Sequence, residues 1–194
     1  MAEIKVLIEG IHKFLDEGKL RICSTVTLIK SDKNILVDTG SFLDKDKLIE
    51  GLKKEGLTVE EIDIVILTHL HLDHLINIYL FKNAKIFCKF NGKSSGQFHI
   101  PSEECLKRTE IEDNIKIAKD VEFLLTPGHT PDSISVVVNT NKGKVVIAGD
   151  AFPKEEFVDL EGEKMGPYEK GQIANLPKEI INILVDDKKV ERIE

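Results

Sequence analysis

Three of the six histidines of the chain lie in one short segment, residues 68–74, which reads Thr-His-Leu-His-Leu-Asp-His. Imidazole nitrogens and carboxylate oxygens are ligands that Zn²⁺ and similar divalent cations accept. His69 and His71 are two residues apart, so both can reach one cation from an extended turn. Asp73 and His74 can reach a second point nearby. A solvated histidine-rich turn is the alternative, and it is disfavoured because a polar cluster directly after a core strand needs a partner.

Two later turns repeat this design, in which a predicted strand ends in a possible metal ligand. His129 lies in a Thr-Pro-Gly-His-Thr turn after segment 121–125, and Asp150 follows Ala-Gly at the end of segment 144–148. Taken singly, each is more typical of an ordinary turn. Because they follow the histidine cluster in this order, they extend it to a candidate site of four histidines and two aspartates.

The elements that must position these residues follow from apolar periodicity and turn residues. The mostly apolar segment 62–67 predicts a strand buried on both faces. The histidine cluster follows its carboxyl end, which is where ligands bind in α/β folds. Segment 44–55 has apolar positions along one side and predicts a helix that Gly56 ends, and Thr58 with Glu61 predicts a capping box. Helices are also expected at 73–81 and 173–184, strands at 4–8, 24–30, 34–38, 85–89, 121–125, 133–139 and 144–148, a loop or hairpin at 91–101, and a last strand or charged tail at 185–194.

Strands that pair first and then alternate with helices predict an α/β layer structure. The 194 residues are expected to form one domain, 1–194. A net charge of −7 does not indicate nucleic-acid binding, although a local basic patch stays possible. Three cysteines form no disulfide framework, and no signal peptide or apolar run of membrane-spanning length occurs. We therefore expect a cytoplasmic protein without a membrane span. Homo-oligomers stay open, because an exposed edge at strand 85–89 or at the C-terminal strand could pair with a second copy.

At these motifs the sequence resembles the metallo-β-lactamase superfamily, from about residue 20 to about residue 158. The segment Val-Asp-Thr-Gly that contains Asp38 matches a first motif, and the histidine cluster, His129 and Asp150 match the next three. The resemblance implies a four-layer αβ/βα sandwich with a metal centre at one edge of two packed sheets. It also implies these roles: His69, His71 and His129 bind one metal, Asp73 and His74 bind a second, Asp150 bridges both, and Asp38 orients a ligand.

The sequence departs from the family at a fifth motif, a late histidine that completes the second metal site. No histidine follows His129. The C-terminal strand and helix are therefore expected to be short or truncated. Otherwise the second metal is weak or absent, or the missing ligand comes from a partner, from His12 or from His99.

The residues and the resemblance together predict a hydrolase that uses a metal-activated hydroxide on an ester, thioester, lactone or phosphodiester bond. Asp73 would orient the attacking water or act as its base. The expected cofactor is Zn²⁺, one or two per chain, with Fe²⁺ or Mn²⁺ as alternatives. The substrate is expected to be small or anionic. Lys154, Lys164 and Lys170 follow the Asp150 turn and could meet an anionic substrate, although a solvated face is the favoured explanation for them.

Two other functions stay open: a non-haem iron sulfur dioxygenase, and a degenerate metal-binding module without catalysis. Within the superfamily, the short chain and segment 146–152 resemble the small group around metallo-β-lactamase domain-containing protein one.

Overall fold

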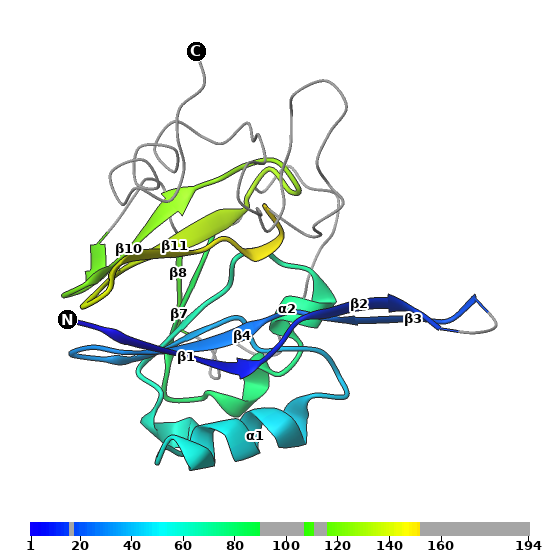
Figure 1. Ribbon diagram of the computed structural model, residues 1–194, viewed down its shortest axis with the longest axis horizontal. Coiled ribbons are helices and arrows are strands. Elements are labelled where there is room, and N and C mark those ends of the chain that lie inside the picture. Colours follow the sequence, from blue (N-terminus) through cyan, green and yellow to red (C-terminus); the bar gives the residue numbers. More distant parts are fainter. Residues whose placement is uncertain (16–17, 90–106, 111–115, 152–194) are drawn as a thin grey trace.

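The computed structural model describes residues 1–15, 18–89 and 116–151, and the backbone of 107–110. Two β-sheets pack face to face, and one helix covers the outer face of the larger sheet (Figure 1). The strands are β1 (Glu3–Ile8), β2 (Ile11–Phe14), β3 (Leu20–Cys23), β4 (Val26–Lys30), β5 (Asn34–Val37), β6 (Ile64–Ile66), β7 (Lys85–Cys88), β8 (Lys107–Glu110), β9 (Lys116–Ala118), β10 (Val121–Leu125), β11 (Ile134–Thr140) and β12 (Gly143–Ile147). The helices are α1 (Lys45–Lys54) and α2 (Leu72–Leu75), with 3₁₀ turns η2 (Val59–Glu61), η3 (Ile78–Leu80) and η4 (Gly149–Ala151).

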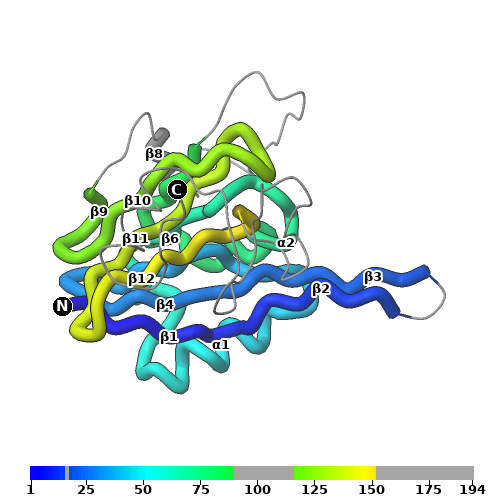
Figure 2. Tube along the Cα trace, turned by 45° about the horizontal axis from the view of Figure 1, so that its top comes forward, coloured from blue at the N-terminus to red at the C-terminus, as the bar shows by residue number. Residues whose placement is uncertain are grey.

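The larger sheet has six strands in the order β1-β4-β5-β6-β7-β8. Its first three strands are antiparallel neighbours, and from β5 to β8 neighbouring strands run parallel. The smaller sheet is antiparallel, in the order β12-β11-β10-β9. Strands β2 and β3 form a separate hairpin that extends away from both sheets (Figure 2).

The alternation of side chains along β5 supplies two different cores. Ile35 and Val37 face the smaller sheet and join an inner core with Phe123, whereas Leu36 faces the opposite side. This is the period-2 pattern of a strand buried on both faces. The rings of Phe87 and Phe123 lie 6.4 Å apart across the two sheets, which joins the layers at the centre. The inner core therefore holds together the two sheets whose edges carry the candidate ligands.

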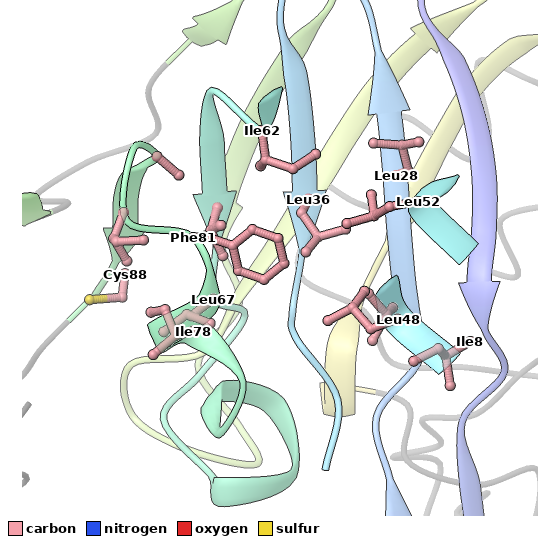
Figure 3. Packing of buried hydrophobic residues seen from close by; sticks show 14 of the residues in the cluster. Ile8, Leu28, Leu36, Leu48, Leu52, Ile62, Leu67, Ile78, Phe81 and Cys88 are labelled. Atoms are coloured by element: carbon pink, nitrogen blue, oxygen red, sulfur yellow. The ribbon is translucent and has the colours of Figure 1, made fainter. Parts of the chain in front are cut away.

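The outer core lies between the larger sheet and α1. Leu48 and Leu52 of the helix are fully buried and point toward Leu28 and Leu36 of the sheet (Figure 3). The helix ends where predicted, because Gly56 adopts a φ of 77°, which a side chain would disfavour. The layers α1, larger sheet and smaller sheet thus stack in the order that the αβ/βα sandwich requires.

The structure confirms the prediction at the 3₁₀ turn η2 and contradicts the prediction at the short helix α2. The Thr58 backbone N–H donates to Glu61 Oε2 at 2.8 Å, the hydrogen bond expected of the capping box. The single helix predicted at 73–81 is wrong, because α2 ends at Leu75 and η3 begins at Ile78. Asn77 lies between them. Its buried side-chain amide donates to backbone carbonyls of the loop after β5, and these hydrogen bonds fix the chain at the point where the helix is interrupted.

Three other features of the fold differ from what the sequence predicts. The strand at 85–89 is not an exposed edge, because β7 lies between β6 and β8. The β2–β3 hairpin, β8 and β9 were not predicted from the sequence, and all of these strands are short. The expected strand at 62–67 is present but its ladder covers only Ile64–Ile66. The expectations at 91–101, 173–184 and 185–194 lie outside the described residues, and in the described part no helix has the length and apolarity needed to cross a membrane.

Candidate metal centre

The candidate ligands come from four strand ends at one edge of the two packed sheets. Asp38 directly follows β5, the segment 68–71 follows β6, His129 follows β10 and Asp150 follows β12. In both views the end of β12 lies beside α2, which carries Asp73 and His74 (Figures 1 and 2). Strands β5 and β6 are parallel neighbours, so their carboxyl ends necessarily meet at the same edge.

Four side chains form a first group that could hold a metal ion. Its ligand atoms, one each from His69, His71, His129 and Asp150, all lie within 4.8 Å of one another. His71 Nδ1 is 3.0 Å from His69 Nε2 and 3.1 Å from His129 Nε2. Asp150 Oδ2 is 3.6 Å from His129 Nε2 and 3.9 Å from His69 Nε2. Three imidazole nitrogens and one carboxylate oxygen are a donor set that suits Zn²⁺.

A second group lies on the other side of Asp150. His74 Nε2 is 3.3 Å from Asp150 Oδ1 and 3.7 Å from Asp73 Oδ2. This nitrogen is fully buried and makes no hydrogen bond. A buried polar atom without a hydrogen bond is costly, and a cation between the nitrogen and the two carboxylates would remove that cost. The second group therefore also fits a metal, with Asp150 shared between the two groups.

Asp38 lies beneath both groups and is 2% exposed. Its Oδ1 accepts a hydrogen bond from the Thr68 backbone N–H at 2.8 Å. Its Oδ2 accepts from Thr68 Oγ1 and from His74 Nδ1, each at 2.8 Å. Asp38 has a φ of 60°, a left-handed conformation that aspartate tolerates better than most residues. The carboxylate thereby orients His74 and leaves His74 Nε2 directed at the second group, which is how ligand histidines are usually held.

The loop after β5 and the turn after β12 hold these groups in place. Thr39 donates both its backbone N–H and its hydroxyl to the His74 carbonyl, at 2.7 and 2.9 Å. Asn77 Nδ2 donates to the carbonyls of Thr39 and Ser41 at 2.9 and 2.8 Å. Gly149 approaches Thr68 so closely that an added Cβ would lie 2.7 Å from the Thr68 Cβ. The turn that presents Asp150 is thus packed directly on the histidine segment.

Burial and the nearby charges shift the pKa of His74 in the opposite direction from those of His69 and His129. Burial, with help from the neighbouring imidazoles, lowers the pKa of His69 to about 3. Burial also lowers the pKa of His129. Burial acts in the same direction on His74, but Asp38 and Asp150 outweigh it and raise its pKa to about 10. In return, the histidines overcome the effect of burial on Asp150 and lower the pKa of its carboxyl. His69 and His129 therefore offer neutral imidazoles to a cation, and a metal at the second group would displace a proton from His74.

The structure brings together all the side chains singled out for metal binding: His69, His71, Asp73, His74, His129 and Asp150, with Asp38 beneath them. His12 lies in β2 and is not part of either group. It does line a cavity of about 400 Å³ together with Asp73 and His74. His99 and the lysines at 154, 164 and 170 lie outside the described residues.

Sequence reasoning assigned no role to Thr68, Asn77 or Gly149. Thr68 was visible as a polar residue at the end of a buried strand, next to the first histidine. Nothing in the local sequence marks Asn77, because its partners lie more than thirty residues away. Gly149 was visible as a glycine before a candidate ligand, but its contact with Thr68 depends on how the two sheets pack.

The family model of the metallo-beta-lactamase superfamily matches residues 20–181. Metallo-beta-lactamase domain-containing protein 1 of Xenopus laevis is 32% identical over 153 residues, 78% of this chain and 64% of that protein. A probable metallo-hydrolase of Methanocaldococcus jannaschii is 34% identical over 146 residues, 74% of this chain and 64% of that protein. The chain therefore spans slightly less than two thirds of the length of these curated relatives.

A solved crystal structure indicates the same superfamily as these sequence relatives. The crystal structure of a metallo-beta-lactamase homologue from Thermotoga maritima matches with a TM-score of 0.70 and 25% identity, over 80% of this chain and 82% of that chain. The resemblance seen in the motifs is confirmed, including the likeness to the group around domain-containing protein 1. The chain belongs to the metallo-beta-lactamase superfamily.

Proposed function

We propose that this protein is a metal-dependent hydrolase that acts on an ester, thioester, lactone or phosphodiester bond. One observation carries the proposal: three imidazole nitrogens and a carboxylate oxygen lie within 4.8 Å of one another, at one edge of two packed sheets. Membership of a superfamily that includes metallo-hydrolases supports it. The chemical class of the cleaved bond is itself proposed.

In this proposal His69, His71 and His129 hold a first cation, Asp73 and His74 hold a second, and Asp150 contacts both. A divalent cation held by these residues, Zn²⁺ first and Fe²⁺ or Mn²⁺ as alternatives, would make hydroxide available near neutral pH and polarise the substrate. Asp73 Oδ2 lies on the second group, 3.7 Å from His74 Nε2. From there the Asp73 carboxylate would orient the attacking water or act as its base.

The substrate, partners and location complete the proposal. The cavity beside Asp73 and His74, about 400 Å³ in volume, suits a small molecule. Cys23 is a buried free thiol, which suits a reducing cytoplasm. We propose that the protein is one domain, 1–194, that it lies in the cytoplasm and that it acts on a small or anionic substrate. Nucleic acid and a second copy of the chain stay open as partners.

The test measures metals and turnover on the same preparations. Protein purified without oxygen is analysed for bound metals and assayed on thioester, lactone, ester and phosphodiester panels, before and after chelation and reloading. We expect one or two zinc ions per chain, and turnover that chelation abolishes and reloading restores. His129→Ala should lose the first cation and turnover, whereas His12→Ala should keep the first cation.

Three results would contradict the proposal or part of it. Dominant iron with sulfur-dependent oxygen uptake would identify a dioxygenase instead. Metal-replete protein without turnover on any panel would identify a binding module. Loss of only the second cation in His12→Ala would make His12 the missing ligand of the second group, and this result would change the site but not the reaction.

A further inference from the structure

Thr68 occupies a junction between the two sheets, immediately before His69. It follows β6 and is 1% exposed. Its backbone N–H donates to Asp38 Oδ1 at 2.8 Å, and its carbonyl accepts from the Ile134 N–H at 2.8 Å. Gly149 packs against its side chain from the turn that carries Asp150. Thr68 is therefore fixed in position from both sheets, and its hydroxyl has little freedom to choose partners.

The partners of that hydroxyl determine where its hydrogen lies. Thr68 Oγ1 is 2.8 Å from Asp38 Oδ2, 3.2 Å from His69 Nδ1 and 3.3 Å from His74 Nδ1, which donates to Asp38. A carboxylate can only accept hydrogen bonds, so Thr68 must donate to Asp38. Its oxygen then offers only lone pairs to His69, and the contact is a hydrogen bond only if His69 Nδ1 carries the hydrogen.

We propose that Thr68 is a positioning residue that relays the hydrogen bond of Asp38 to His69 and thereby sets the tautomer of that ligand. The inference rests on the proposed metal site. Asp38 contacts His74 Nδ1 directly at 2.8 Å and reaches His69 through Thr68. One buried carboxylate thus orients a histidine in each of the two groups.

The relay has a chemical consequence at His69 Nε2. With the hydrogen on Nδ1, Nε2 keeps a lone pair that faces the first group, 3.0 Å from His71 Nδ1 and 3.9 Å from Asp150 Oδ2. With the hydrogen on Nε2, that lone pair is lost and a cation cannot bind there. Ligand histidines commonly depend on a partner that fixes this choice, and removing the partner typically weakens metal binding by about 10- to 100-fold.

The test compares three variants without relying on turnover. Thr68→Val keeps the shape of the side chain and removes the hydroxyl, and Thr68→Ser restores a hydroxyl. Thr126→Val is the matched control, because it removes a buried threonine hydroxyl that pairs with Ser135 Oγ at 2.9 Å. Ring ¹⁵N shifts of metal-free protein report which nitrogen of His69 bears the hydrogen, and a competition titration reports the affinity for zinc.

We expect the wild type, Thr68→Ser and the control to show His69 with its hydrogen on Nδ1. Thr68→Val should populate the other tautomer and bind the first zinc about 10- to 100-fold more weakly. The relay is refuted if wild-type His69 carries its hydrogen on Nε2, a measurement that needs no variant. It is also refuted if folded Thr68→Val keeps both tautomer and affinity. A correct tautomer in a protein that hydrolyses nothing would refute the proposed function and leave the relay intact.

Discussion

Substituting Gly149 with alanine should be far more harmful than the same change at an ordinary turn position. Gly149 has a φ of 56°, and a Cβ built on it would lie 2.7 Å from both Cβ and Oγ1 of Thr68. The left-handed backbone costs a residue with a Cβ about 1–2 kcal/mol. The contact adds about 1–3 kcal/mol, the usual cost of overpacking, because the Thr68 Cβ is attached to a fixed backbone. We expect Gly149→Ala to lower the free energy of unfolding by about 2–5 kcal/mol.

Gly56 provides a matched control for the backbone part of this cost. It has a φ of 77°, and nothing lies within 4 Å of a Cβ built there. Gly56→Ala should therefore lose only the backbone cost, about 1–2 kcal/mol. Gly149→Ala should also weaken binding of the first cation, since the displaced turn carries Asp150, whereas Gly56→Ala should leave that affinity unchanged.

Urea unfolding followed by far-ultraviolet circular dichroism measures both variants, because the chain has no tryptophan to report by fluorescence. Calorimetric titration with zinc on the folded proteins supplies the second readout. Equal losses of stability in the two variants would refute the close contact between Gly149 and Thr68. Unchanged zinc affinity in a destabilised Gly149→Ala would show that the contact supports the fold but not the site.

Three further changes test the buried network and the metal groups. Asp38→Asn tolerates the same backbone conformation but replaces one of the two acceptor oxygens with an NH₂ donor, so it cannot accept all three hydrogen bonds from Thr68 and His74. We expect about 1–3 kcal/mol less stability by urea unfolding and about 10- to 100-fold weaker zinc binding by titration. Burial raises the pKa of Cys23 to about 11 from 9.0, so the unfolded chain loses this proton first, and stability linked to this thiol should fall as pH rises from 9 toward 11. Mass spectrometry should find Cys23 alkylated at pH 8 only after unfolding; ready labelling of the folded protein would contradict its burial. Zinc at a hundred times its Kd should stabilise the protein by about 2.7 kcal/mol in thermal unfolding, an effect that His129→Ala should abolish.

Local sequence predicted those elements of the fold that a periodic pattern of apolar residues or a characteristic turn residue specifies. Leu48 and Leu52 lie one turn apart and mark the buried face of α1, and Gly56 ends it because its conformation requires glycine. The break in the segment 73–81 was not predictable, since it depends on hydrogen bonds from Asn77 to carbonyls that are distant in sequence. The β2–β3 hairpin was missed because its strands are mostly exposed, so neither carries the run of apolar residues that marks the equally short strands β5 and β7.

The same division applies to the metal centre. The residue types and spacing of the segment 68–74, with one histidine and one aspartate at later strand ends, were sufficient to identify the candidate ligands and the superfamily. Only the packing of the two sheets decided that His129 and Asp150 meet this segment within hydrogen-bonding range. Packing also decided that Asp38 and Thr68 lie beneath the ligands and that Gly149 must lack a side chain. Sequence determines which donors a chain carries and where each strand ends, but the distances and tautomers that make them a site depend on contacts between residues far apart in the chain.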